Sequence, residues 1–308
     1  MDRASYFIKD KALFGSFPTQ ESIKELENNG VRFFIDLTYK NERGIIPYKT
    51  IYKYISYPIY DQQIPSNNLE FAIFIVKICD IIKKLKDNEK IYIHCKGGHG
   101  RSGLVVAIIL SKIFDISGKL ALEYTKKAHN MRKIMKDKWR QIGSPQTFLQ
   151  KSFVINFTKT IYFGKSFKNS ISTGFSNFSE HSIYIEPIGL FPNAESAIQA
   201  HKNLKDIKYV NKHLKSPYPM YSKNLGKKYP DTIEWIKKCP SIVLMILRKK
   251  YEQNEYLKQI LLNTKLCKLV SYIKGDYIFS IGDNGEGLNI LGKQLMKLRD
   301  EYLRQLNN

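Results

Sequence analysis

The sequence predicts an α/β protein with two domains: a first domain with a mainly parallel sheet flanked by helices, and a helix-rich α+β second domain. The chain has 308 residues, more than the roughly 100–200 residues of a usual single domain. Its first half alternates short β-rich runs with helical patterns, which is typical of parallel sheets. Its second half contains mostly helical patterns.

The first half supplies strands and helices in alternation. A threonine or asparagine with an early acidic residue marks the start of two helices, and Gly30 marks the end of the first. A mostly apolar, buried helix is expected directly after a glycine-rich loop. The predicted strands are 31–37, 52–59 and 90–95, and the predicted helices are 19–30, 67–87, 102–114 and 144–157.

The second half follows without a Pro-, Gly- or Ser-rich linker, because the last of these helices leads almost directly into a predicted strand at 160–163. We therefore expect a boundary near residue 157, with one domain at 1–156 and the other at 157–308. Further helices are predicted at 193–205, 230–254 and 289–306, and no internal repeat is found.

The net charge of +22 favours anionic partners such as phosphoproteins, nucleotides or nucleic acid. A lysine-biased composition that only keeps the protein soluble is an equal alternative. The densest basic segment, 126–140, has helical spacing and contains Trp139. We interpret it as a solvated helix face, with a surface that binds a polyanion as the alternative.

Hydropathy and cysteine content favour a cytoplasmic address, with the nucleus as an alternative. The sequence contains no run of about 18 apolar residues and its first residues lack the apolar stretch of a secretion signal, so no membrane partner is expected. The four cysteines are scattered without metal-ligand spacing, which favours a reducing compartment and predicts no bound metal.

The segment HCKGGHGRSG, residues 94–103, follows a predicted strand and opens a predicted helix. Its glycines allow successive N–H groups to turn inward, and the helix N-terminus adds positive potential, so the loop can bind an anion. Arg101 can hold two oxygens of that anion, and the same groups favour the thiolate form of Cys95. A thiolate that faces a bound phosphate is arranged to attack phosphorus, and Ser102 can then help the sulfur to leave. A buried inert cysteine or a nucleotide-binding loop explains less, because neither accounts for Cys95 and Arg101 together.

This segment resembles the signature of the protein tyrosine phosphatase superfamily, His-Cys, five residues, then Arg-Ser/Thr. The short first domain is similar to the dual-specificity branch. The resemblance implies that His94 orders the loop, that His99 faces substrate, and that Lys96 and His99 make the pocket more cationic. No cofactor is implied. The residues expected to contact the phosphate are His94, Lys96, Gly97, Gly98, His99 and Gly100.

The family also uses an aspartate on an upstream loop to protonate the leaving oxygen. The segment YPIYDQQIPS supplies Asp61 for this role, and a simple turn residue is the alternative. Further along, QTFLQKSF resembles a segment of classical tyrosine phosphatases in which a glutamine positions the hydrolytic water. Gln146 is the candidate for that glutamine, and Gln150 is the alternative.

Several short patterns in the second half together resemble the NADAR (YbiA-like) N-glycosidase family. They are TIYFGKS, GFSNFSE, FPNAESAIQAHK, NLGKKYPDTIEWIKK and GDYIFSIGDNGEGLNILGKQLMKLR. The sequence departs from the family pattern at Ser196, where a histidine is usual, and at Phe279–Ser280, where Trp-Gly is usual. The family positions retained are Asn177, Phe178, Glu195, Gln199, Lys202, Gly226, Trp235, Asp276, Asn289 and Gly292.

Breaking an N-glycosidic bond builds positive charge on the sugar ring, which a nearby carboxylate stabilises. The resemblance implies Glu195 and Asp276 for this task, Trp235 for stacking, and Lys202 for a phosphate or the departing base. As alternatives, Glu195 is a solvated helix carboxylate and Trp235 a core residue. The other ligand contacts implied are Asn177 and Asn289.

We therefore expect a cysteine-dependent phosphatase, acting by default on phosphotyrosine or phosphoserine/threonine in proteins. It is joined to an N-glycosidase for ADP-ribose or a related N-ribosyl compound. The alternative is a phosphatase of RNA 5′-phosphate or phosphoinositide joined to a non-catalytic reader of ADP-ribose. A third class is a scaffold or reader whose basic surface binds nucleic acid or ADP-ribosylated targets while neither site turns over.

Overall fold

The computed structural model describes residues 2–164 and 174–307, so Lys165 and Ser166 of the TIYFGKS pattern lie outside the described residues. The chain divides into two compact units. The first is Met1–Lys159 together with Leu306–Asn308, and the second is Thr160–Gln305. The division follows Lys159, three residues after the boundary expected from the sequence.

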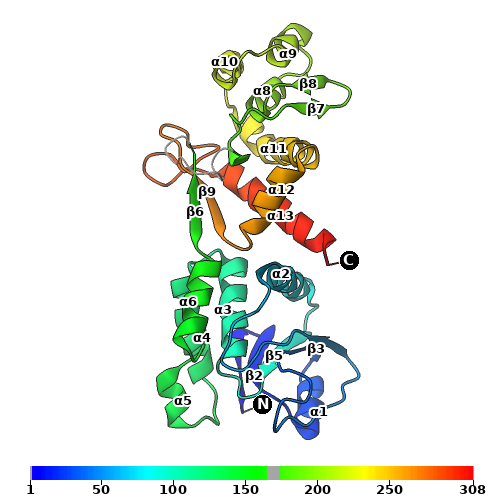
Figure 1. Cartoon of the computed structure of the whole chain (residues 1–308), viewed down its shortest axis with the longest axis vertical. Coiled ribbons are helices and arrows are strands. Elements are labelled where there is room, and N and C mark those ends of the chain that lie inside the picture. The colour runs from blue at the N-terminus through cyan, green and yellow to red at the C-terminus, as the bar shows by residue number, and fades with distance from the viewer. Residues whose placement is uncertain (1, 165–173, 308) are drawn as a thin grey trace. The chain divides into compact units, whose positions relative to one another are not determined.

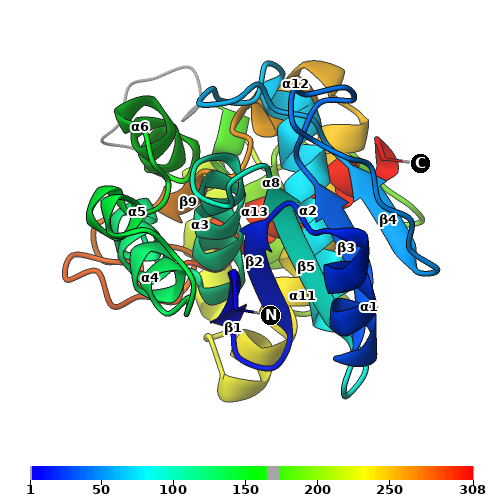
Figure 2. The same ribbon diagram turned by 90° about the horizontal axis from the view of Figure 1, so that it is seen from below.

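The first unit is built on a five-stranded sheet in the order β1-β2-β5-β3-β4, and Figure 2 shows the strands side by side in this order. β1 and β2 pair antiparallel, and all other neighbours pair parallel. The prediction of a mainly parallel sheet is therefore confirmed, although the sequence analysis missed the first two strands. The strands are β1 (Ala4–Ile8), β2 (Ala12–Ser16), β3 (Val31–Asp36), β4 (Lys53–Ser56) and β5 (Lys90–Cys95).

The central strand β5 positions the glycine-rich loop. Ile91 and Ile93 are fully buried within the sheet, and the strand ends at Cys95. Asp36 at the end of β3 lies opposite His94 in the parallel register. In parallel α/β sheets, ligands bind outside the carboxyl ends of the strands, and this is where the glycine-rich loop begins.

Helix α3 begins at Arg101 and is almost entirely buried, from Leu104 to Leu110 among others. It packs against α2, α4 and α6, and Figure 1 shows α3, α4 and α6 side by side. The predicted caps are present, since the side chains of Thr19 and Asn67 accept hydrogen bonds from the first turns of α1 and α2. The helices are α1 (Gln20–Asn28), α2 (Asn68–Lys84), α3 (Arg101–Phe114), α4 (Gly118–Asn130), α5 (Asp137–Ile142) and α6 (Phe148–Phe157).

The basic segment 126–140 is not one solvated helix, and that interpretation was wrong. Helix α4 ends at Asn130 and α5 begins only at Asp137. Between them Arg132 is 2% exposed, with its guanidinium 4.4 Å from the ring centre of Phe14 and donating to the Phe14 carbonyl at 3.2 Å. Arg132 therefore packs inward just after the end of α4.

The second unit is the predicted helix-rich α+β domain. β6 (Thr160–Phe163) pairs parallel with β9 (Lys268–Ser271), and β7 (Ile183–Ile185) pairs antiparallel with β8 (Gly189–Phe191). The long helix α11 packs against α8 and α13, as Figure 1 shows. The helices are α8 (Ala194–Ala200), α9 (Ile207–Leu214), α10 (Pro219–Leu225), the 3₁₀ turn η1 (Gly226–Lys228), α11 (Ile233–Glu252), α12 (Glu255–Asn263) and α13 (Ile290–Gln305). Within residues 2–164 and 174–307, every helix is too short or too polar to cross a membrane.

Candidate functional site

The loop between β5 and α3 surrounds a nearly buried thiol. Cys95 is 2% exposed, and its Sγ lies 3.5 Å from the Oγ of Ser102, as the sequence predicts for a serine that assists the sulfur. Gly98 has φ +74°, and a Cβ there would lie 2.4 Å from the backbone of Gly15. The loop therefore needs glycine at this position both for its conformation and for its contact with β2.

Arg101 is 1% exposed and is held by two carboxylates. Its Nη1 and Nη2 donate to the Oε2 and Oε1 of Glu42 at 2.6 and 2.8 Å, and its Nη2 lies 3.1 Å from the Oδ1 of Asp61. Nη1 also donates to the carbonyl of Ile59 at 3.0 Å. Hydrogen bonds from Arg101 lower the pKa of Glu42, so this residue stays charged at neutral pH.

The structure thus brings Asp61 to the loop, and it adds Glu42, which the sequence analysis missed. Glu42 follows β3, the neighbour of β5, and no local motif marks it. The available signal was its place after a parallel strand, because such turns meet at the same edge of the sheet.

His94 supports the loop from inside the protein. It is completely buried, with Nε2 2.7 Å from the hydroxyl of Tyr48 and Nδ1 3.7 Å from the Oδ1 of Asp36. Burial lowers the pKa of His94 to about 4, although the charge of Asp36 opposes this effect. A neutral histidine in this position agrees with the expected role of ordering the loop.

His99 does not make the pocket more cationic, which corrects the expectation from the sequence. Its Nδ1 lies 2.8 Å from the Nε2 of His129, and its ring stacks on Trp139 with centroids 4.4 Å apart. Burial, together with the charge of Arg132, lowers the pKa of His99 to about 3, so the ring is neutral. Lys96 is exposed and donates to the carbonyl of Arg43 at 2.7 Å.

Both candidate glutamines lie beside the loop. A Cβ on Gly100 would be 3.2 Å from the Oε1 of Gln146 and 2.9 Å from that of Gln150. Gln150 is fully buried, and both ends of its amide are hydrogen-bonded. Its Oε1 accepts from the N–H of Thr147 in the capping box of α6, and its Nε2 donates to the carbonyl of Gln63 at 3.1 Å. This leaves Gln146 as the better candidate for positioning a water molecule.

In the second unit, Glu195 lies in α8 and is 4% exposed. Gln199 donates to its Oε1 at 2.9 Å, and the backbone N–H of Glu195 donates to the carbonyl of Asn177 at 2.9 Å. Burial raises the pKa of Glu195 to about 6. The carboxylate is therefore not the solvated helix residue of the alternative interpretation.

The cations near Glu195 are paired with other carboxylates. Lys223 Nζ lies 3.4 Å from the Oδ2 of Asp276, and Lys202 Nζ lies 2.6 Å from the Oδ1 of Asp231. The charges of Lys223 and Lys202 both act to lower the pKa of Glu195, but less strongly than burial raises it. Lys223 lies in α10, where no sequence pattern connects it with Asp276, so its place in this site was not predicted.

Three of the retained family positions, two of them expected ligand residues, have buried polar atoms without a hydrogen-bond partner among the described residues. They are the Oδ1 of Asn177, the Oε1 of Gln199 and the Nε1 of Trp235. Such atoms are costly to leave unsatisfied, so each is available to a ligand or a water molecule. Lys202 Nζ lies 5.8 Å from the ring centre of Trp235, which places a cation beside this aromatic surface.

In contrast, the polar side chains of Asn289, Ser196 and Ser280 are hydrogen-bonded within the protein. The Asn289 amide accepts from the N–H of Ser271 at 2.9 Å and donates to the carbonyl of Leu269 at 3.1 Å, so it holds β9 rather than the expected ligand. Ser196 is fully buried and accepts from Ser222 at 2.8 Å, and Ser280 donates to the carbonyl of Ser271 at 2.7 Å. Within the ranges that the structure describes, no three His, Cys, Asp or Glu side chains gather as metal ligands.

Comparison with known proteins gives two family matches. Residues 11–113 match a family model described as the DSP-PTPase phosphatase of polymorphic toxin systems, and residues 162–303 match the NADAR domain. "Putative tyrosine phosphatase 197R" of Invertebrate iridescent virus 6 is 34% identical over 301 residues, covering 96% of this chain and 90% of the relative. "N-glycosidase YbiA" of Escherichia coli is 33% identical over 129 residues, covering 41% of this chain and 79% of YbiA.

Among solved structures, the NMR structure of the E. coli protein YbiA is 29% identical, covers 49% of this chain and 89% of its own, and gives a TM-score of 0.43. The crystal structure of Tk-PTP in its active form is 21% identical over 46% of this chain and 92% of its own, with a TM-score of 0.35. Together with the extended similarity to the viral relative, the two family matches place the chain. It belongs to the family of proteins that join a phosphatase domain of the tyrosine and dual-specificity type to a NADAR domain.

Proposed function

We propose that the first unit hydrolyses phosphomonoesters through a phosphocysteine intermediate on Cys95, with phosphorylated proteins as the default substrate. The observation that supports this most directly is the buried thiol beside a buried, carboxylate-paired Arg101. The Cys95 thiolate attacks phosphorus and a P–S bond forms, while the P–O bond to the leaving group breaks. Asp61 gives a proton to the leaving oxygen, and Gln146 holds the water that later breaks the P–S bond.

The hydrogen bonds of Arg101 suggest how substrate engages the acid. Its Nη1 and Nη2 donate to Glu42 and to the carbonyl of Ile59, and Nη2 also forms an ion pair with Asp61, whereas its Nε is buried without a partner. A phosphate that binds in a bidentate fork uses Nε and one hydrogen of Nη2. The phosphate then replaces Asp61 beside Nη2, and Asp61 is released to act as the acid.

For the second unit we propose N-glycosidic cleavage of ADP-ribose or a related N-ribosyl compound. The supporting observations are the buried carboxylate of Glu195 and the buried, unpartnered polar atoms of Asn177, Gln199 and Trp235 in the same unit. A carboxylate in such a site stabilises positive charge on a ribosyl ring, and the indole can stack on base or sugar. A reader domain without turnover is the alternative. At Ser196 and Ser280 the usual family residues are replaced by serines whose hydroxyls make hydrogen bonds within the protein.

Replacement of Cys95 by serine should abolish hydrolysis of an aryl phosphate, because a hydroxyl is a far weaker nucleophile than a thiolate. Binding of vanadate or phosphate should persist, since Arg101 and the loop remain. Wild-type hydrolysis should need no added metal and should be blocked by vanadate. Continuous assay with a chelator checks this, and activity that survives Cys95→Ser but not the chelator contradicts the mechanism.

Replacement of Asp61 by asparagine should slow hydrolysis of alkyl and peptide phosphates by about 10²–10⁴. The loss should be smaller for an aryl phosphate whose leaving group has a low pKa, because that oxygen needs little protonation. Steady-state kinetics on both substrates measures the difference. Equal losses would assign the acid elsewhere, with Asp80 and Asp36 as the next candidates.

Replacement of Glu42 by glutamine should reduce kcat/KM for the same aryl phosphate by about 10²-fold. The Arg101 guanidinium then loses the carboxylate that holds it in position to bind phosphate. Vanadate should bind more weakly as well, which a purely structural effect on folding does not require. Glu21→Gln, on the exposed surface of α1, is the matched control. An unchanged kcat/KM in a folded Glu42→Gln protein would rule out this positioning role.

Replacement of Glu195 by glutamine should abolish release of base from an N-ribosyl substrate, while ligand affinity stays within a few-fold. Because burial raises the pKa of Glu195 to about 6, wild-type turnover should rise with pH through this value as the carboxylate forms. Chromatographic detection of released base between pH 5 and 8 tests both points. Binding of ADP-ribose without any released product would favour the reader, and absence of binding would refute both readings of this unit.

A further inference from the structure

A cavity of about 350 Å³ lies next to the phosphate loop, at the carboxyl end of β3. Its volume is at the lower end of the range of roughly 300–1,000 Å³ that small-molecule sites occupy. Two of its lining residues contact the loop directly. The N–H of Phe17 donates to the carbonyl of Lys96 at 3.0 Å, and the hydroxyl of Tyr48 lies 2.7 Å from the Nε2 of His94.

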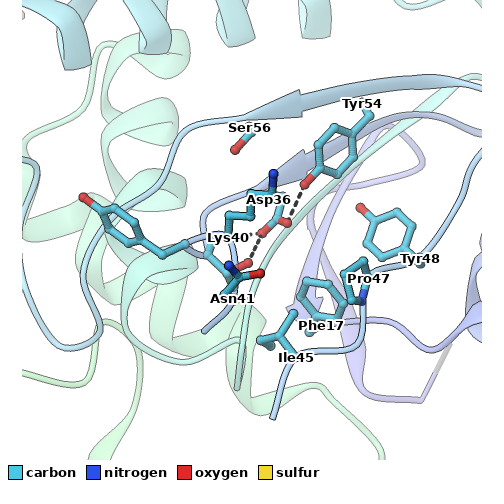
Figure 3. Close-up of a pocket in the computed structure, with 11 residues that line it drawn as sticks. Phe17, Asp36, Lys40, Asn41, Ile45, Pro47, Tyr48, Tyr54 and Ser56 are labelled. Carbon is cyan, nitrogen blue, oxygen red and sulfur yellow. Dashed lines mark hydrogen bonds between the residues drawn. The ribbon is translucent and has the colours of Figure 1, made fainter. Parts of the chain in front are cut away.

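Aromatic rings form much of the cavity wall. Phe17 and Tyr48 meet edge to face with centroids 5.4 Å apart, and Tyr48 meets Tyr54 in the same way at 5.8 Å. Figure 3 shows these rings with Pro47 and Ile45 around the cavity, and the carboxylate of Asp36 among them. Such walls suit a flat ring, because the faces of nucleobases stack on aromatic side chains.

The polar group in this wall is a buried acceptor. Asp36 is 5% exposed, and its Oδ1 accepts from the N–H and hydroxyl of Thr38 at 2.8 and 2.7 Å. Its Oδ2 accepts from the hydroxyl of Tyr54 at 2.7 Å. A carboxylate oxygen has two acceptor sites, so Oδ2 keeps one for a donor in the cavity. An aspartate that accepts from an amino group is a known way to read a base edge.

We propose that this cavity binds an amino-bearing nucleobase, such as adenine or cytosine, with the ring among Phe17, Tyr48 and Tyr54 and the amine donating to Asp36. Lys40 lines the cavity, and the net charge of +22 attracts the phosphates that accompany such bases. The base can belong to a nucleotide substrate of Cys95 or to a free nucleoside.

The site is connected to the catalytic machinery through the turn 39–45. Lys40, Asn41 and Ile45 of this turn line the cavity, while Glu42 of the same turn holds Arg101. The N–H of Ile45 donates to the carbonyl of Glu42 at 3.0 Å, so the two sides of the turn are joined. A base in the cavity therefore contacts the segment that fixes the phosphate-binding arginine.

Methyl NMR of the full chain tests binding at this place, independently of any ligand site in the second unit. The δ1-methyl signal of Ile45, assigned through Ile45→Val, should shift saturably with adenosine. Purine riboside lacks only the amine and should need at least about tenfold higher concentration, because it gives no hydrogen bond to a charged acceptor. Ser56→Phe fills the rim and should remove the shift, whereas Lys53→Phe, on the same strand outside the cavity, should keep it.

The proposal is overturned if neither adenosine nor cytidine moves the Ile45 signal, if purine riboside binds as well as adenosine, or if Ser56→Phe binds as well as Lys53→Phe. Two kinetic measurements, which rest on the proposed phosphatase function, distinguish a base that belongs to the substrate from a base that belongs to a free nucleoside. If the base is part of the substrate, adenosine 5′-monophosphate should have a lower KM than ribose 5-phosphate, and Ser56→Phe should remove this difference. A free nucleoside leaves the two KM values equal and changes kcat for an aryl phosphate. If the wild-type protein hydrolyses none of these substrates but the Ile45 signal still shifts with adenosine, the phosphatase proposal is refuted and the proposed base site is retained.

Discussion

The buried guanidinium of Arg101 is the constraint around which the carboxyl edge of the first sheet is organised. A cation with 1% exposure is costly unless carboxylates and carbonyls surround it. Glu42 comes from the turn after β3, and Ile59 and Asp61 come from the segment after β4. The need to solvate one arginine therefore brings three loops together over the strand that carries Cys95.

A second layer of side chains, made by His94, Tyr48 and Asp36, supports this arrangement. His94 is neutral because burial lowers its pKa to about 4, and it lies between the hydroxyl of Tyr48 and the carboxylate of Asp36. Burial also raises the pKa of Tyr48, so its hydroxyl keeps its proton. Asp36 is the carboxylate of this layer, and it accepts hydrogen bonds from Thr38 and Tyr54.

The sequence predicted what local patterns encode and missed what depends on packing. The segment 94–103 defines a strand, a loop and a helix start within ten residues, and the structure has all three. Glu42 and Lys223 were missed because their partners, Arg101 and Asp276, are 59 and 53 residues away. The helical spacing of 126–140 was misleading, since periodicity cannot show that the helix ends at Asn130 or that Arg132 packs on Phe14 beyond it.

The second unit shows how burial can outweigh nearby charge. The spacing of Glu195 and Gln199 on one helix face was readable from the sequence, and the hydrogen bond between them follows from it. The pKa of Glu195, however, also depends on two nearby lysines and on the carboxylates with which they pair. Lys202 pairs with Asp231 and Lys223 with Asp276, so neither cation is left to stabilise the Glu195 carboxylate fully. Burial then dominates, and the pKa rises to about 6. A carboxyl group at that value exchanges its proton near neutral pH, which a general acid or base requires and a purely structural helix residue does not.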